Sequence, residues 1–222
     1  MLRSEIFTNG INKQIEVNVL SFLNSNKKMM NKRSLDSPRA VGDAVQNILE
    51  ENFAECVPEG IIKDFNSSFA RRSMADFAFT DCNGFYHVID NKTHNLGTQF
   101  NMPNLTSVER LSRFYQDDKN YFDLLFIAYK AEDGELLFDE CHFEPIEHFE
   151  WSCLTLGALG WGQIQIANSN ILKIDNKITR RKWMLDLCSA LEIFYPREIE
   201  KITDRIEHFK NIREYWEAHE DI

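Results

Sequence analysis

The chain has 222 residues, of which 43% are hydrophobic, and this is enough to bury one substantial core. Its net charge of −10 argues against a protein that coats nucleic acid nonspecifically, because such proteins are usually basic overall. No apolar run reaches the roughly 18 residues that a membrane span needs, so no membrane partner is expected. The five cysteines are widely spaced and lack metal-ligand spacing, which predicts reduced, buried thiols in a cytoplasmic protein.

The charges are segregated along the chain. Residues 131–150 contain eight acids and no Lys or Arg. Residues 26–39 and 173–182 each carry five basic residues against one acid. Such a distribution permits a basic cleft on an acidic body, although charge runs are more commonly solvated loops and faces.

The first quarter of the chain is predicted to be helical. Residues 4–24 fit one or two helices, because their apolar side chains recur near helical spacing. A polar, basic loop is expected over residues 25–39. A strongly amphipathic helix then follows the sequence "DSPRAVGD", and Pro58 and Gly60 close it.

A β-hairpin is predicted from residue 75 onward, because Asn83-Gly84 separates the strand-like runs "ADFAFTD" and "FYHVIDNKT". The remaining elements are expected to be a helix over 105–118, strands over 121–130 and 161–168, and helices over about 180–195 and 196–218, the last beginning at Pro196. This order predicts a single α/β (α+β) domain with a central mixed β-sheet flanked by helices.

Three charged residues stand in the hairpin where its pattern favours apolar ones. Asp90 and Lys92 point to the same side of their strand, because strand side chains alternate. Asp76 begins the preceding strand, so the hairpin would bring it beside Asp90. Two neighbouring carboxylates repel each other and need a cation, and oxygen ligands of this kind suit Mg²⁺. The pattern is therefore typical of a phosphodiester-cleaving site assisted by Lys92, or else of strand-end residues that pair at the surface.

A longer stretch around these residues resembles a known family. "ADFAFTDCNGFYHVIDNKT" resembles the PD-(D/E)xK nuclease core, with Ala75 in place of the usual proline, and "KTHNLGTQFNMPN" is similar to type II restriction endonucleases of that superfamily. The resemblance implies a restriction endonuclease-like domain over residues 1–222, in which Asp76 and Asp90 bind Mg²⁺ and Lys92 is catalytic. Asp43 matches a position where the family often carries a glutamate that faces the same site.

The same resemblance implies that the loop "QFNMPN" enters the DNA. Asn104 matches a position that hydrogen-bonds base edges in the major groove, and Asn101 or Phe100 would wedge between bases. Asn104 is equally suited to cap the helix that follows it. Basic residues that would contact phosphates, unless they only form a solvated helix start, are Lys177, Arg180, Arg181 and Lys182.

A second cluster of possible metal ligands lies in the acidic segment, where His142 and His148 accompany Glu144 and Glu147. Their irregular spacing favours solvated loop residues over a metal site.

These observations predict a type II restriction endonuclease that uses Mg²⁺ to cleave double-stranded DNA at a short symmetric sequence, as part of a restriction-modification system. A symmetric site calls for two active sites related by a twofold axis, so a homodimer is expected, with residues 1–40 as a possible interface or DNA-contact region. Two alternatives stay open: a repair or recombination nuclease of the same superfamily that recognises DNA structure, and a non-catalytic DNA-binding protein of the same fold.

Overall fold

The computed structural model describes residues 3–26, 37–66, 75–132 and 135–219. Most of the predicted basic loop, residues 27–36, lies outside the described residues. The chain divides into two compact units, Met1–Ile178 and Thr179–Ile222, and each is described by itself.

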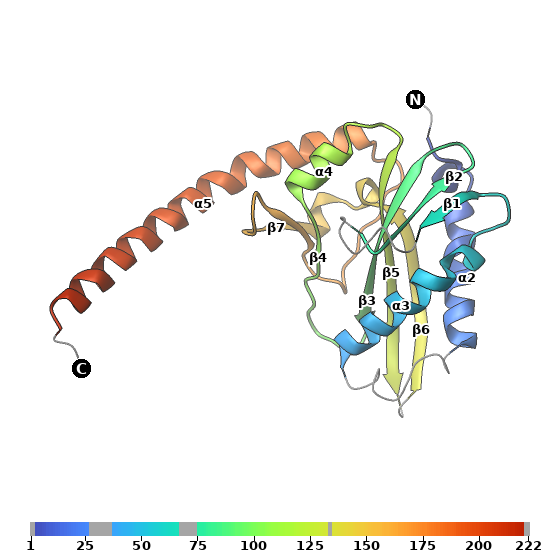
Figure 1. Ribbon diagram of the computed structural model, residues 1–222, viewed down its shortest axis with the longest axis horizontal. Helices are drawn as coiled ribbons and strands as arrows, with labels where there is room; N and C mark the ends of the chain where they lie inside the picture. The colour runs from blue at the N-terminus through green and yellow to red at the C-terminus, as the bar shows by residue number, and fades with distance from the viewer. Residues whose placement is uncertain (1–2, 27–36, 67–74, 133–134, 220–222) are drawn as a thin grey trace. The chain divides into compact units, whose positions relative to one another are not determined.

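The first unit is a mixed α+β structure that contains all the described strands (Figure 1). Its helices and strands, in chain order, are α1 (Glu5–Thr8), α2 (Ile11–Ser25), α3 (Pro38–Cys56), β1 (Ile62–Asn66), β2 (Phe77–Asp81), β3 (Tyr86–Asn95), β4 (Asn104–Ser107), α4 (Val108–Phe114), β5 (Asn120–Glu132), β6 (Glu135–Pro145), the short 3₁₀ helices η4 (Ile146–His148) and η5 (Trp151–Cys153), β7 (Leu154–Gly157) and β8 (Gln163–Ile166).

Two sheets organise this unit. The larger sheet has the strand order β1-β2-β3-β5-β6 and is mixed, because β3 and β5 run parallel while the other neighbours run antiparallel. The smaller sheet has the order β4-β8-β7. The predicted fold class, a central mixed sheet flanked by helices, is thus confirmed.

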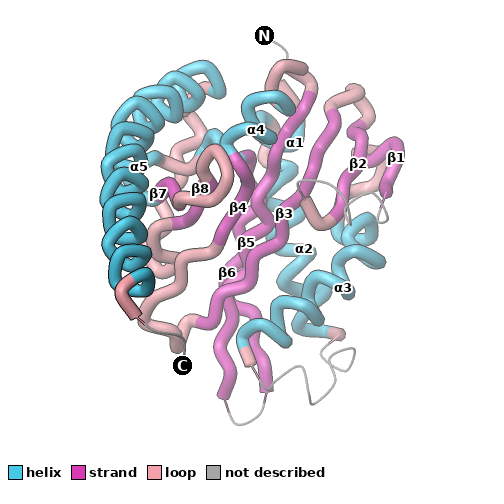
Figure 2. Tube along the Cα trace, turned by 60° about the vertical axis from the view of Figure 1, so that its left-hand side comes forward, coloured by secondary structure: helices cyan, strands magenta, loops and turns pink. Residues whose placement is uncertain are grey.

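Helices α2 and α3 pack on one face of the larger sheet (Figure 2). Helix α3 begins where Ser37 caps it, with the Ser37 side chain accepting a hydrogen bond from the Ala40 N–H at 3.2 Å. A Cβ at Gly42 would lie 3.1 Å from Thr93 Oγ1, so glycine allows α3 to approach β3 closely. The side chains that fill this interface include Val19, Leu23, Val45, Leu49, Phe53, Phe77, Phe79, Ile89, Leu125 and Ile127.

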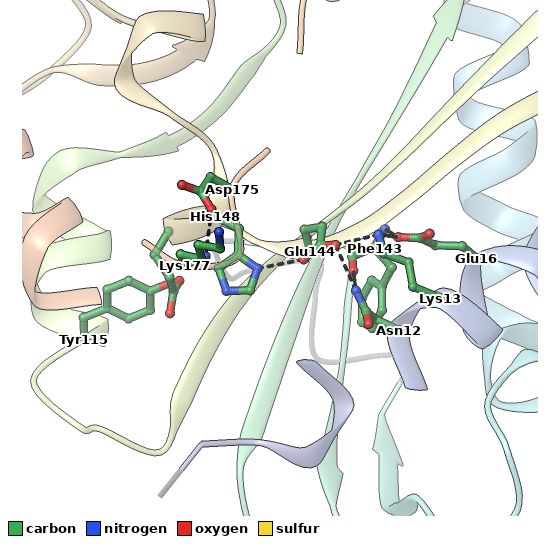
Figure 3. A network of polar contacts seen from close by, with 10 residues as sticks. Asn12, Lys13, Glu16, Tyr115, Phe143, Glu144, His148, Asp175 and Lys177 are labelled. Atoms are coloured by element: carbon green, nitrogen blue, oxygen red, sulfur yellow. Dashed lines mark hydrogen bonds and ion pairs between the residues drawn. The ribbon is translucent and has the colours of Figure 1, made fainter. Parts of the chain in front are cut away.

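Strand β6 is the edge of the larger sheet, and side chains of α2 form hydrogen bonds with its backbone. Glu16 accepts a hydrogen bond from the Phe143 N–H at 2.8 Å, and Asn12 donates to the Phe143 carbonyl at 3.2 Å. Buried Glu144 accepts hydrogen bonds from Lys13 and His148, each at 2.7 Å, and Figure 3 shows it between them. The α2 side chains thereby protect an edge that would otherwise offer unpaired backbone groups.

The interpretation of the acidic segment as solvated loop is therefore wrong. Residues 135–145 form strand β6, and Glu144, Glu147 and His148 are buried. Glu147 accepts a hydrogen bond from the Tyr115 hydroxyl at 2.6 Å. These residues join helices to the sheet by hydrogen bonds, which their sequence spacing alone did not reveal.

A buried charge network surrounds His87 on β3. Its Nδ1 lies 2.7 Å from Asp123 and its Nε2 3.6 Å from Asp81, which in turn accepts a hydrogen bond from Ser4 at 2.9 Å. Burial by itself would lower the pKa of His87, but the two aspartates outweigh this effect and raise it above 6.5. A cationic His87 therefore offsets two buried carboxylates.

This network predicts how stability depends on pH. Because the pKa of His87 is raised in the folded state, its contribution is fully present below about pH 6.5 and is lost as the pH rises through the folded value. We expect the free energy of unfolding to fall over that upper range, and an NMR titration of the His87 ring to place its protonation above pH 6.5. A ring that titrates at or below pH 6.5 would contradict the assignment.

The second unit is a single helix, α5 (Arg180–Glu217), with Thr179 as its N-cap. Two helices separated at Pro196 were predicted, and this is wrong because Pro196 lies inside the helix. A proline inside a helix removes one backbone hydrogen bond and crowds the carbonyl four residues earlier, which destabilises the helix. The helix-forming residues on both sides of Pro196 offset this loss. The apolar stripe of α5 is exposed, with Ile206, Phe209 and Trp216 at 55%, 67% and 60%.

None of the described helices is both long and apolar enough to cross a membrane. Cys56, Cys141 and Cys153 are buried and free, as predicted, whereas Cys82 and Cys188 are exposed. The cytoplasmic location stays a prediction.

Candidate active site

The hairpin of β2 and β3 brings Asp76 beside Asp90. Phe77 pairs with Ile89 in the antiparallel register. Asp76, which precedes Phe77, therefore lies opposite Asp90, which follows Ile89. The Asp76 N–H donates to the Ile89 carbonyl at 2.8 Å, and the Asp76 carboxylate accepts from the Asn91 N–H at 2.7 Å. Backbone groups of Ile89 and Asn91, the two neighbours of Asp90, thus hold Asp76 in place.

Asp90 and Lys92 form an ion pair on one face of β3. Lys92 Nζ lies 2.7 Å from Asp90 Oδ1. The Asp90 side chain is 7% exposed and that of Lys92 is 22% exposed, so the ammonium group lies nearer to solvent. Ile89 points into the core beneath α2 and α3, and alternation therefore directs Asp90 and Lys92 to the opposite face of the sheet.

The two carboxyl groups have perturbed acidities. Burial raises the pKa of Asp90 to about 7, with a further increase from Asp76, although Lys92 acts in the opposite direction. Burial also raises the pKa of Asp76, and the negative charge of Glu50 adds to this increase. Carboxyl groups with pKa values shifted in this way are typical of functional sites.

The residues present fit a hard divalent cation. Asp90 Oδ2 is buried and has no hydrogen-bond partner among the described residues, although a buried carboxylate oxygen normally has one. Within the described ranges, no three His, Cys, Asp or Glu side chains are grouped to hold a metal. A site here would therefore combine two aspartates with a backbone carbonyl and water, as Mg²⁺ sites commonly do.

Helix α3 contributes Glu50, which sequence reasoning missed. Glu50 is partly buried, accepts a hydrogen bond from Gln46 at 2.9 Å, and acts electrostatically on Asp76. Asp43 lies two turns earlier on α3 and is exposed. The two acids are seven residues apart and so lie near the same side of the helix. Helical spacing alone therefore could not tell which of them belongs to the site.

The segment "QFNMPN" is held against the chain that follows β8. The Asn101 carbonyl accepts from the Ser169 N–H at 2.9 Å, and the Asn104 side chain accepts from Gln165 Nε2 at 2.6 Å. Phe100 is 60% exposed and Asn104 is also exposed, as DNA-contacting residues must be. Gln165 was missed, although the alternation of Gln and Ile in "GQIQIAN" marked a polar strand face.

The predicted capping role of Asn104 is wrong. Residues 104–107 form strand β4, and Ser107 caps α4 by accepting from the Arg110 N–H at 3.1 Å. The backbone N–H and C=O groups of this segment pair with β8. They therefore do not form the start of a helix that Asn104 could cap.

The predicted phosphate contacts fall in two units. Lys177 is exposed near the end of the first unit. Arg180, Arg181 and Lys182 begin α5, where Lys182 pairs with Asp186. Their part in DNA binding stays a prediction.

No protein-family model matches the chain, and no curated protein matches its sequence.

Proposed function

We propose that this protein is a type II restriction endonuclease: a Mg²⁺-dependent deoxyribonuclease that cleaves double-stranded DNA at a short symmetric site as a homodimer. The observation that carries the proposal is the site at the end of the hairpin. Asp90 there has one oxygen paired with Lys92 and the other without a described partner, directly beside Asp76.

The residues divide the chemistry among them. Asp76 and Asp90 would hold the ion, which supplies charge neutralisation at the phosphate and a more acidic water. Lys92, whose ammonium group is partly exposed, can donate a hydrogen bond to the phosphate oxygen that gains negative charge. It can also orient the attacking water, because its flexible stem allows it to leave Asp90. Glu50 adds negative charge to the same site.

The loop residues would supply recognition. Asn104 and Gln165 form a pair of amides at the surface, and amides are suited to base edges because each carries both a donor and an acceptor. Phe100 and Asn101 precede them and would contact or wedge between bases.

Plasmid digestion tests the proposal. Purified full-length protein with plasmid DNA and Mg²⁺ should give discrete fragments, and EDTA should abolish cleavage because carboxylates alone cannot stabilise the reacting phosphate. Trimming or nicking of branched DNA without discrete fragments would favour a repair nuclease. Binding without any cleavage would favour a non-catalytic DNA-binding protein and would reject the endonuclease.

A further inference from the structure

The side chain of Asn170 joins two parts of the proposed site. Its Oδ1 lies 2.8 Å from Nε2 of His94 on β3. Its Nδ2 donates to the backbone carbonyls of Thr98 and Gln99 at 3.1 and 3.0 Å. Asn170 therefore links the strand that carries Asp90 and Lys92 to the start of the "QFNMPN" loop.

The hydrogen bonds fix the orientation of both side chains. Carbonyl oxygens only accept, so Nδ2 of Asn170 must face Thr98 and Gln99, and Oδ1 must face His94. An amide oxygen cannot donate, so the hydrogen of the contact lies on Nε2 of His94. Nδ1 of His94 is buried without a hydrogen-bond partner in the part of the chain that the structure describes. The contact with Asn170 therefore holds the His94 ring in one orientation.

His94 lies in line with the candidate catalytic residues. Asp90, Lys92 and His94 alternate with inward-facing residues and so share one face of β3. His94 is 1% exposed and its ring centre lies 6.0 Å from that of Phe126 on β5. This packing makes the imidazole a rigid attachment point, so any displacement of Asn170 acts on the strand through it.

On the other side of Asn170, the start of the loop carries local hydrogen bonds: the Thr98 N–H donates to the Asn95 carbonyl at 2.9 Å and the Gly97 N–H donates to Asn95 Oδ1 at 2.8 Å. Gly97 and Gln99 are exposed, and Phe100 projects into solvent. Further along, the Ser169 N–H holds the Asn101 carbonyl at 2.9 Å. Residues 168–170 thus form a bracket that sets the position of the loop relative to β3.

We propose that Asn170 is a positioning residue that couples the seating of the loop at residues 98–104 on DNA to the placement of Lys92 and Asp90. This inference rests on the proposed endonuclease function. Correct base contacts would hold the loop in one position. The hydrogen bonds of Asn170 to the loop and to His94 would then set the position of β3 to match. Catalysis is sensitive to such alignment, since a displacement of about 1 Å can cost roughly a hundredfold in rate.

The test compares Asn170→Ala with the wild type on two DNA duplexes. One duplex carries the site mapped from the ends of wild-type digestion products, and the other differs by one base pair. Single-turnover cleavage of the mapped site should fall about tenfold to a hundredfold in the variant. The ratio of cleavage rates between the two duplexes should fall at least about tenfold, because correct contacts no longer align the catalytic strand.

The ratio separates positioning from a merely structural role. Both duplexes are cut by the same preparation, so a reduced folded fraction lowers both rates and leaves their ratio unchanged. Asn170→Asp keeps an acceptor for His94 but loses the donors to the loop, and should lower the ratio as well. Asn52→Ala is the matched control, because its amide donates to the carbonyl of Ile48 at 2.7 Å within α3.

Each outcome is decisive. A variant that cuts both duplexes in the wild-type ratio overturns the coupling and leaves the endonuclease function intact. A wild-type protein that cuts no DNA overturns the proposed function and the coupling with it. Loss of discrimination in both Asn170 variants, with Asn52→Ala behaving as wild type, supports the proposal.

Discussion

Replacing Asp90 by asparagine is expected to abolish DNA cleavage while leaving DNA binding in Ca²⁺ largely intact. The substitution removes one of the two neighbouring carboxylates, which is also the anionic partner of Lys92 at 2.7 Å. Loss of charge stabilisation at the phosphate should lower the single-turnover rate by at least about a thousandfold, equivalent to roughly 4 kcal/mol. Plasmid cleavage and a filter-binding or fluorescence anisotropy titration measure the two effects.

The matched control is Asp64→Asn, which changes an exposed aspartate on β1 of the same sheet. It should cleave at the wild-type rate. Undiminished cutting by Asp90→Asn would reject the site assignment.

The same substitution should stabilise the protein at high pH. Burial raises the pKa of Asp90 from 3.8 to about 7, so the fold disfavours its ionised form and the wild type loses stability as the pH rises between those values. Asp90→Asn avoids this loss, and the gain at pH 8 should be on the order of 1 to 3 kcal/mol. Denaturant unfolding at pH 8 and pH 4 checks the sign, because the difference should shrink towards zero at the lower pH.

Glu50→Gln should reduce cleavage far more than Asp43→Asn. Glu50 is the acid of α3 that acts on Asp76, whereas Asp43 is exposed. Neutralising an acid that acts on a proposed metal ligand should lower the single-turnover rate by about tenfold to a hundredfold. Each substitution exchanges one acid for its amide on the same helix, so the pair forms its own control.

The dependence of the rate on Mg²⁺ concentration gives a second measurement. Glu50→Gln should need more Mg²⁺ for half-maximal cleavage, and Asp43→Asn should not. The opposite order would return Asp43 to the site and remove Glu50 from it.

The hairpin shows how far local pattern alone can predict this protein. Alternation and the Asn83-Gly84 turn determine the pairing of β2 with β3, and Gly84 adopts a φ of 80° that favours glycine. The period of two then places Asp90 and Lys92 on one face. These features depend on residues close in sequence, and the structure confirms that Asp76 lies beside Asp90.

Other residues depended on contacts that no local pattern encodes. Asp43 and Glu50 share a side of α3, and the way α3 packs in the fold decides that Glu50 is the one that acts electrostatically on Asp76. Asn104 follows a proline and suits a helix cap, yet pairing with β8 makes it a strand residue. In each case a tertiary contact overrode a weak local preference.

The sequence by itself determined the hairpin, the amphipathic helix α3, the mixed α+β class and the convergence of two aspartates and a lysine. Only the tertiary structure decided that acidic residues 135–145 form an edge strand covered by α2, that Glu50 is the acid of α3 that acts electrostatically on Asp76, and that Asn170 meets His94 across 76 positions. The physical reason is the range of the interactions. Side-chain periodicity and turn geometry act over a few residues, whereas edge protection, burial of charge and bridging hydrogen bonds arise only when distant segments pack together.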